Sequence, residues 1–363
     1  MTTQRSPPEI EDVEQTSCEH CGEGLDVSTF QTFSEITCPT CEQILIVPGR
    51  FNELLVIEEI ERKEEASVYV ALDKDRKLLQ ELHIFNFFFE KPHQEKKFLV
   101  QAKAACGLDT PHMVRHCAYG VINGFPYVSM ELSDGMPMSH YIDPDTPQDE
   151  LTCLHAMLEI SKAMDTAESE QVLHGDLKPD NFLVDDQGIT KLTGFIISKF
   201  SQSYDHHIQG TPLYIAPEKA NREWADFRSD QFSLGASFWH IMGGYPPFSG
   251  ETAADVVRSR YTSPKPDIRS VAQQVSEETS LFLQRMMESE PRSRFPTFRD
   301  LVEELETLIS QLEERASNEE HYREELEVEA HELHHNQSKR RVKIVGLVLF
   351  IFIMWYFVTQ VIF

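Results

Sequence analysis

Basic residues are scarce in this chain. Its 363 residues include 33 Lys and Arg against 60 Asp and Glu, so the formal net charge is −27 at pH 7. A charge of this sign and size repels the phosphate backbone of nucleic acids, and we therefore expect no nucleic-acid partner. The remaining composition, with 40% hydrophobic and 26% charged residues, is ordinary for a globular protein and allows one large domain with small additions.

An apolar run is absent from the start of the sequence and present at its end. Residues 1–15 are polar, which predicts that there is no signal peptide. Residues 344–363 contain no charged side chain, and as a helix they would be about 30 Å long, enough to cross a bilayer. A buried core helix is the alternative, but such helices are rarely apolar on every side.

A basic cluster, residues 339–343, directly precedes this apolar segment. The positive-inside rule assigns such clusters to the cytoplasmic face of a membrane. We therefore expect a single-pass, tail-anchored protein of the cell membrane, with a transmembrane helix at 344–363 and with everything before residue 339 in the cytoplasm.

Four of the seven cysteines form two pairs with the same short spacing, Cys18-x2-Cys21 and Cys38-x2-Cys41. This spacing is typical of two zinc knuckles whose four thiolates hold one structural Zn²⁺. Disulfides are the alternative, which a cytoplasmic location disfavours. We expect a zinc ribbon at residues 17–48, after a polar tail at 1–16. The ribbon contains no Lys or Arg, so its pattern favours a structural or protein-contact role.

After the ribbon, the sequence changes from strand patterns to helix patterns. β-Branched and aromatic residues predict short strands, and helical patterns dominate from about Thr152 onward. The segments expected in the first part are strands at Leu54–Ile57, Ser67–Ala71, Tyr119–Val121 and Tyr127–Glu131, and a helix at Phe98–Cys106.

The stretch from His174 to Val184 reads His-Gly-Asp-Leu-Lys-Pro-Asp-Asn-Phe-Leu-Val. It resembles the catalytic loop of the eukaryotic-type Ser/Thr protein kinases, which include membrane-anchored bacterial members. The resemblance implies that Asp176 accepts the proton of a substrate hydroxyl, that Lys178 lies near the transferred phosphate and that Asn181 holds one Mg²⁺.

The resemblance covers about residues 52–310 and implies an α+β, bilobal fold, with a small lobe rich in strands and a larger helical lobe. Glu218 ends a stretch similar to an activation segment and would pair with a buried Arg294. Asp230 would brace the backbone of the catalytic loop. These parts hold the fold and by themselves say nothing about catalysis.

Glycine is missing where an active kinase of this family needs it. The alignment puts Glu61, Lys63 and Ala66 at the three positions of the glycine-rich loop. Side chains at these positions would block the approach of backbone N–H groups to the phosphates of ATP.

Charged groups of the family are replaced as well. Glu81 stands at the position of the phosphate-pairing lysine, and Gln101 at the position of its glutamate partner. Gly194 replaces the aspartate that binds Mg²⁺, and Gly175 replaces the arginine that receives an activation-loop phosphate. Leu79 replaces a small alanine above the adenine and would crowd it.

The resemblance therefore implies a vestigial nucleotide cleft, in which binding of ATP and Mg²⁺ is weak or absent. His174 and Phe195 persist and are implied to pack together behind the catalytic loop. The residues expected to line the cleft are Val68, Met130, Glu131, Leu132 and Leu183.

Three functional hypotheses follow from these observations. In the first, the chain is a pseudokinase that acts as a membrane-tethered scaffold or regulatory binding module for a protein partner that the sequence does not identify. In the second, it is an active but atypical Ser/Thr kinase that works with Asp176, Lys178 and Asn181. In the third, which the acidic ribbon disfavours, it is a zinc-ribbon nucleic-acid binder.

Residues 311–343 read as an acidic helical stalk with a basic flank. Apolar residues between 301 and 333 fit one heptad frame, which allows a homodimer, although Arg315, Glu319 and Glu329 fall in the same frame. A solvated helix that links the domain to the membrane is the alternative. The apolar positions are Leu301, Leu305, Leu308, Leu312, Tyr322, Leu326 and Leu333.

Overall fold

The computed structural model describes most of the chain and divides it into two units, Met1–Glu306 and Thr307–Phe363. The first unit contains the ribbon and both lobes. The described residues are 9–62, 66–89, 91–195, 211–221, 225–262, 266–323, 325–327 and 349.

The ribbon consists of two short antiparallel hairpins, β2 (Gln15–Ser17) with β3 (Gly24–Asp26) and β4 (Glu35–Thr37) with β5 (Ile44–Ile46). The turn of the first hairpin needs a left-handed residue, and Gly22 supplies it with φ +78°. Buried apolar residues from both hairpins pack around two of the cysteines, Cys18 and Cys38.

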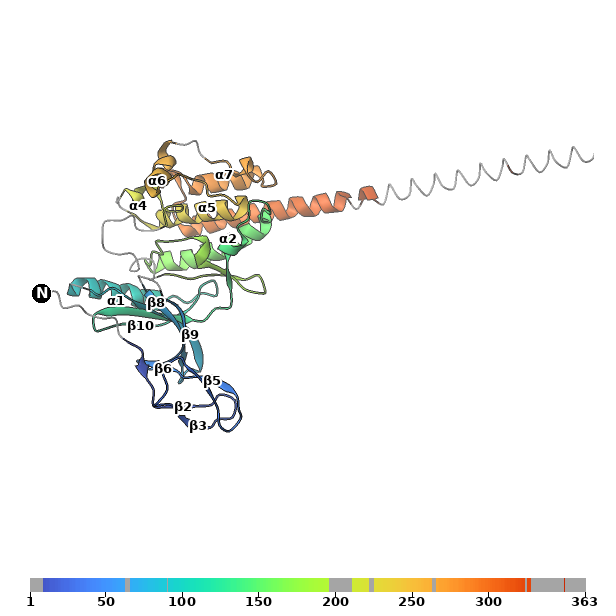
Figure 1. Ribbon diagram of the computed structural model, residues 1–363. Helices are drawn as coiled ribbons and strands as arrows, with labels where there is room; N and C mark the ends of the chain where they lie inside the picture. Colours follow the sequence, from blue (N-terminus) through green and yellow to red (C-terminus); the bar gives the residue numbers. More distant parts are fainter. Residues whose placement is uncertain are drawn as a thin grey trace, which may run out of the picture. The chain divides into compact units, whose positions relative to one another are not determined.

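The small lobe is a seven-stranded antiparallel sheet (Figure 1). Its first strand precedes the ribbon in sequence and its second strand follows it, so the ribbon is inserted at one edge of the sheet. In spatial order the strands are β1 (Glu11–Asp12), β6 (Gly49–Phe51), β7 (Leu54–Arg62), β8 (Ala66–Asp73), β9 (Leu78–Phe85), β11 (Phe125–Glu131) and β10 (His116–Ile122).

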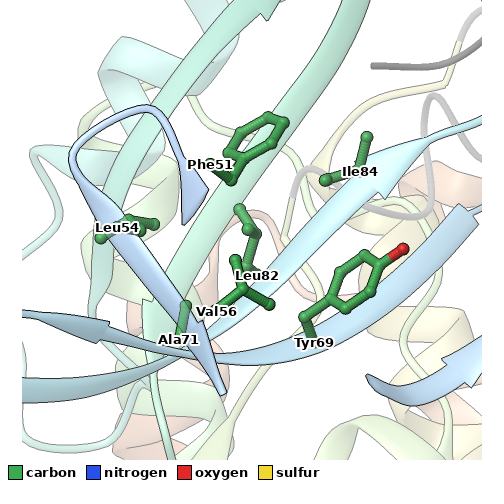
Figure 2. Close-up of a cluster of buried hydrophobic side chains, with 7 residues drawn as sticks. All are labelled: Phe51, Leu54, Val56, Tyr69, Ala71, Leu82 and Ile84. Carbon is green, nitrogen blue, oxygen red and sulfur yellow. The ribbon is translucent and has the colours of Figure 1, made fainter. Parts of the chain in front are cut away.

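One face of this sheet buries an apolar cluster, which Figure 2 shows. The edge of the Phe51 ring meets the Tyr127 ring at 5.1 Å between centroids. Two side chains from the ribbon part of the chain, Ile10 and Phe33, also pack against the cluster. The cluster consists of Phe51, Leu54, Val56, Tyr69, Ala71, Leu82 and Ile84.

The helix of the small lobe, α1 (Pro92–Cys106), begins at Pro92 and not at Phe98 as the sequence pattern predicted. Pro92 has the fixed φ that suits the first helical position, and the Lys91 N–H donates to Gln94 Oε1 at 3.0 Å, so a start signal precedes the apolar pattern. A ladder of phenylalanine rings, Phe85, Phe87, Phe89 and Phe98, joins α1 to the end of β9.

The second lobe is mainly helical, and its helix starts carry the expected caps. Asp149, Asp226 and Ser276 each accept a hydrogen bond from a backbone N–H of the first turn. Helix α5 is buried over most of its length and forms the centre of this lobe. The helices with printed bounds are α2 (Glu150–Ser169), α4 (Pro217–Ala220), α5 (Phe227–Gly243), α6 (Ala253–Thr262) and α7 (Glu277–Met286), and residues 298–323 are also helical.

A small sheet of β12 (Met136–Pro137), β13 (Phe182–Val184) and β14 (Thr190–Leu192) follows the small lobe. Short 3₁₀ helices complete the second lobe: η1 (Met138–Tyr141), η2 (Pro179–Asn181), η3 (Ile268–Ser270) and η4 (Pro291–Ser293).

In the part of the chain that the structure describes, no helix combines the length and apolar character needed to span a bilayer. The predicted transmembrane segment, 344–363, lies outside the described residues except for residue 349. Of the heptad positions, Leu301, Leu305, Leu308 and Leu312 are buried, Tyr322 and Leu326 are exposed, and Leu333 is not described. A homodimer through residues 301–333 therefore stays a prediction.

Candidate functional site

Helix α5 holds the backbone of the loop that carries the kinase-like motif, residues 174–184. The carboxylate of Asp230 accepts hydrogen bonds from the backbone N–H groups of His174, at 3.0 Å, and Gly175, at 2.9 Å. Asp230 is buried, so these charge-assisted bonds form where water competes little. The bracing role predicted for Asp230 is confirmed by this geometry.

Asp176 is held at the centre of the loop. Its Oδ1 accepts from the N–H of Thr211 at 2.9 Å and from the Thr211 hydroxyl at 3.2 Å. Lys178 Nζ lies 3.5 Å from Asp176 Oδ2, and the Asn181 amide donates to the Asp176 carbonyl at 2.9 Å. The structure thus brings the three predicted catalytic residues together. Thr211 was not predicted to belong to this site, although it lies seven residues before Glu218 in the stretch that resembles an activation segment.

The side of the loop where the family resemblance placed Mg²⁺ lacks one of the expected groups. Gly194 adopts φ +87°, and a Cβ built on it would lie 3.0 Å from the Asn181 side chain. The Asn181 amide therefore occupies the space next to Gly194, and no carboxylate is supplied at this position. Within the described residues, the only group of three or more His, Cys, Asp or Glu side chains with metal-binding spacing is the four-cysteine cluster. At Gly194 the loop therefore lacks the carboxylate with which the kinase family binds Mg²⁺.

Glu81 is paired within its own strand. Its carboxylate Oε1 contacts Nε2 of His83 on the same face of β9. Burial alone would raise the pKa of Glu81, but the hydrogen bond and the charge from His83 lower it. On α1, Oε1 of Gln101 is buried and has no hydrogen-bond partner among the described residues. An acid–histidine pair thus stands where active kinases have a lysine that can reach a phosphate.

The two lobes meet in a stack of rings. The Phe195 ring lies 4.7 Å from the His174 ring and 6.5 Å from the His116 ring, edge to face in both cases. The predicted packing of His174 against Phe195 is confirmed. His116, on β10, was not singled out in the sequence, and neither of its ring nitrogens has a partner among the described residues. Burial, with smaller contributions from His174 and His83, lowers the pKa of His116 to about 4.

The residues expected to line the nucleotide cleft come from both lobes. Val68 and Met130 are buried, and the Thr193 hydroxyl donates to the Met130 sulfur at 3.3 Å, which joins the lobes behind the cleft. Leu132 donates its N–H to the Leu79 carbonyl at 3.2 Å.

The remaining two residues that were expected to line the cleft, Glu131 and Leu183, both lie next to Lys191 on β14. The Glu131 carboxylate lies 3.8 Å from Lys191 Nζ and 3.7 Å from Arg115 Nε. Leu183 is opposite Lys191 in the β13–β14 ladder. Leu79 is 43% exposed, so no packing buries the side chain that was expected above the adenine.

The helical lobe contains a buried ion pair. Arg294 contacts the Glu218 carboxylate with two nitrogens, at 2.7 and 2.9 Å, and the Ser229 hydroxyl donates to the same carboxylate at 2.6 Å. Burial alone would raise the pKa of Glu218, but Arg294 outweighs it and lowers the pKa. The predicted pairing of Glu218 with Arg294 is confirmed.

The four ribbon cysteines form a second candidate site. Their sulfurs all lie within 4.8 Å of one another, with Cys18 3.5 Å from Cys41 and Cys21 3.7 Å from Cys38. A tetrahedral zinc ion with four thiolates at about 2.3 Å separates the sulfurs by about 3.8 Å. Backbone N–H groups of Cys41 and Thr40 favour the Cys38 thiolate and lower its pKa to about 7. The cluster is compatible with a metal ion such as zinc.

A strand-rich lobe, a helical lobe and an Asp-Lys-Asn loop between them define the class of two-lobed proteins built for phosphoryl transfer. The family model described as the protein kinase domain matches residues 60–305, and the chain therefore belongs to the protein kinase family.

Its relatives include bacterial Ser/Thr kinases. The chain is 26% identical to the serine/threonine-protein kinase PrkC of Bacillus subtilis over 72% of its own length and 41% of the relative's. It is 32% identical to the DNA damage-responsive serine/threonine-protein kinase RqkA of Deinococcus radiodurans, over 62% of its own length and 34% of the relative's. The chain thus spans less than half the length of these curated relatives.

Among solved structures, the crystal structure of Rad53 in complex with AMP-PNP matches with a TM-score of 0.57 and 22% identity. The match covers 69% of this chain and 64% of that one. At this identity the likeness shows the fold alone.

Proposed function

We propose that the chain is a pseudokinase that serves as a scaffold or regulatory binding module. The observation that carries the proposal is Gly194, which supplies no carboxylate for Mg²⁺ and next to which the Asn181 side chain fills the space. Glu81 and Gln101 support the same proposal, because neither side chain can place a positive charge beside a phosphate.

Phosphoryl transfer depends on positioning and on electrostatic stabilisation of the phosphate oxygens. In this cleft a carboxylate, Glu81, replaces the lysine, and the hydrogen bond and charge of His83 lower its pKa despite burial. Because Glu81 is paired with His83, the position offers no free positive charge to the phosphate oxygens. The change therefore supports loss of activity.

The second candidate is an active, atypical Ser/Thr kinase. The favouring observation is the complete arrangement around Asp176, which Thr211 orients and Lys178 approaches at 3.5 Å. Such a base could still accept the proton of a substrate hydroxyl. Its alternative role is structural, because the same contacts tie the activation-segment end to the loop.

The two candidates are separated by calorimetric titration of the full chain with ATP, with and without Mg²⁺, and by phosphate incorporation into the chain itself and into a generic Ser/Thr substrate. We expect weak ATP binding that Mg²⁺ changes less than twofold, and no incorporation above an Asp176→Ala variant. Asp180→Ala, which removes an exposed aspartate of the same loop, is the matched control. Incorporation by wild type and Asp180→Ala, but not by Asp176→Ala, would establish the active kinase.

We further propose that residues 18–41 hold one structural Zn²⁺ and that residues 344–363 tether the chain to a membrane with the kinase-like domain in the cytoplasm. Sulfur spacing supports the first proposal. The uncharged segment and its basic flank, residues 339–343, support the second. A tethered module of this kind would act by recruiting a protein partner.

A further inference from the structure

A cavity of 610 Å³ lies between the ribbon and the small-lobe sheet. We call it the ribbon cavity. Its floor consists of Ser67 and Tyr69 on β8 and Ile84 on β9, and the ribbon side contributes Ile10 and Phe33. None of its lining residues belongs to the catalytic loop or to the four-cysteine cluster. Its volume is in the range of sites that bind small molecules or single side chains.

Two aromatic rings form one wall of the ribbon cavity. The Phe33 and Tyr69 rings are nearly parallel, with an interplanar angle of 25° and 6.3 Å between centroids. Tyr69 and Ile84 are buried, so this part of the cavity is largely shielded from solvent. A shielded wall of this kind binds another aromatic ring or an aliphatic chain well.

The ribbon holds Phe33 in an unfavourable backbone conformation. Its φ is +67°, in the left-handed region that bulky side chains rarely adopt. The Phe33 N–H donates to the Val47 carbonyl at 2.7 Å, and Ser34 N–H donates to the Gln31 carbonyl at 3.0 Å, so the turn is locked. Backbone strain of this sort is concentrated at ligand clamps and switch regions. The strained turn keeps the Phe33 ring beside Tyr69.

The rim of the ribbon cavity carries more negative than positive charge. Glu59 and Arg62 form an ion pair, with Arg62 Nε 3.0 Å from Oε1 and Nη2 2.6 Å from Oε2. The hydrogen bond and charge of Glu59, and then Tyr69, raise the pKa of Arg62. Among the described residues that line the cavity, Glu59 neutralises Arg62, and the carboxylate of Glu9 leaves one net negative charge. A cation near the mouth is therefore favoured over an anion.

An aromatic wall that is shielded from solvent is typical of a site that receives an anchor residue from a protein. We propose that the ribbon cavity receives an aromatic side chain of a protein partner, presented next to a lysine or arginine. The ring packs against the wall that Phe33 and Tyr69 form, and the basic residue lies near Glu9. The chain's net charge of −27 favours a basic partner in the same way at long range. This site is independent of whether the kinase-like cleft transfers phosphate.

The test is a ¹⁹F NMR titration of the full chain with the peptide acetyl-Gly-Lys-Trp-Lys-Gly-amide that contains 5-fluorotryptophan. We expect a saturable shift of the fluorine signal, and at least tenfold weaker binding when both lysines are replaced by glutamate. Ser67→Phe, which fills the cavity floor, should abolish binding. Leu281→Ala, at an exposed apolar residue of the helical lobe, is the matched control and should bind as wild type does.

A double variant at the rim keeps the test decisive if Ser67→Phe does not fold. Glu9→Gln combined with Glu59→Gln changes only rim residues and should reduce the preference for the lysine peptide over the glutamate peptide at least fivefold. Absence of binding to wild type at millimolar peptide, or binding that none of the cavity variants changes, overturns the proposal. Equal binding of free 5-fluorotryptophan and of the peptide overturns the protein partner in favour of a small aromatic ligand.

Discussion

At the scale of single residues, Asn181 connects the two features that bear on catalysis. Its amide donates to the Asp176 carbonyl at 2.9 Å and also lies beside Gly194. In an active kinase of this family the same asparagine would share Mg²⁺ with an aspartate at the position of Gly194. Here the glycine lets the amide approach the backbone, so restoring the carboxylate by substitution also disturbs the loop.

Gly194→Asp is therefore expected to lower the free energy of unfolding by about 1 kcal/mol, because its φ of +87° is unfavourable for a side chain and the new Cβ meets Asn181. Urea denaturation of the full chain measures the change. Gly194→Ala is the control for the backbone cost, since it adds the Cβ without the carboxylate. If Gly194→Asp, alone or with Glu81→Lys, raises Mg-ATP affinity without loss of stability, the loop is more adaptable than its geometry indicates.

His116→Leu is expected to stabilise the chain by roughly 1–3 kcal/mol at pH 7, because both buried ring nitrogens lack partners within the described part of the chain. The pKa of His116 is lowered from 6.5 to about 4 in the folded state, so between these pH values the unfolded chain binds more protons and stability falls as the pH falls. The advantage of the leucine should thus widen by roughly 2 kcal/mol between pH 7 and pH 5. Urea denaturation at both pH values checks this.

The control for this prediction is His140→Leu, at an exposed histidine of the other lobe. It should leave the free energy of unfolding within about 0.5 kcal/mol of wild type at both pH values. A His116→Leu variant that is less stable than wild type at pH 7 would show that the imidazole has a polar partner, such as a buried water molecule.

At the scale of elements, the ribbon is too small to be stable through its own core. Its strands contain three residues each, and its apolar cluster includes two of the cysteines, Cys18 and Cys38. Small domains of this kind usually need a metal or disulfides. A zinc ion would also fix the ribbon beside β1 and β6, which belong to the sheet of the small lobe.

We expect purified protein to contain one Zn²⁺ per chain and Cys18→Ser to reduce the metal content to near zero, because a missing thiolate opens the tetrahedral shell. Elemental analysis of the full chain measures the content. Cys117→Ser, outside the cluster, should retain the metal. Equal loss in both variants, or no stoichiometric metal in wild type, would exclude a specific zinc site.

At the scale of the whole molecule, the charge of the chain and its apolar C-terminal segment determine how it is expected to behave in a cell. Unit Met1–Glu306 contains the ribbon, both lobes and the ion pair of Glu218 with Arg294. We therefore expect that the folding of this unit does not depend on residues 344–363. A role of the apolar segment in a membrane stays a prediction.

Deletion of residues 344–363 is expected to move the protein from the membrane fraction to the soluble fraction without loss of helical circular dichroism. An unrelated apolar helix of the same length in place of 344–363 should restore membrane binding, which controls for the deletion itself. Protease added to intact cells should leave the kinase-like domain uncut. Rapid cleavage from outside would reverse the predicted orientation, and membrane binding of the deleted chain would exclude the tail as the anchor.

Local patterns in the sequence were enough to predict strands in the first part of the chain, helices in the second and the cluster of four cysteines, because each depends on residues close together in the chain. The two-lobed fold was predicted through the family resemblance. The pairings of Asp230 with the catalytic loop and of Glu218 with Arg294 could also be predicted, but only through the family resemblance. Only the tertiary structure decided the contacts between distant segments. The unpartnered His116 between the lobes, the Asn181 amide beside Gly194 and the Phe33–Tyr69 wall of the ribbon cavity join residues whose spacing in the sequence carries no signal.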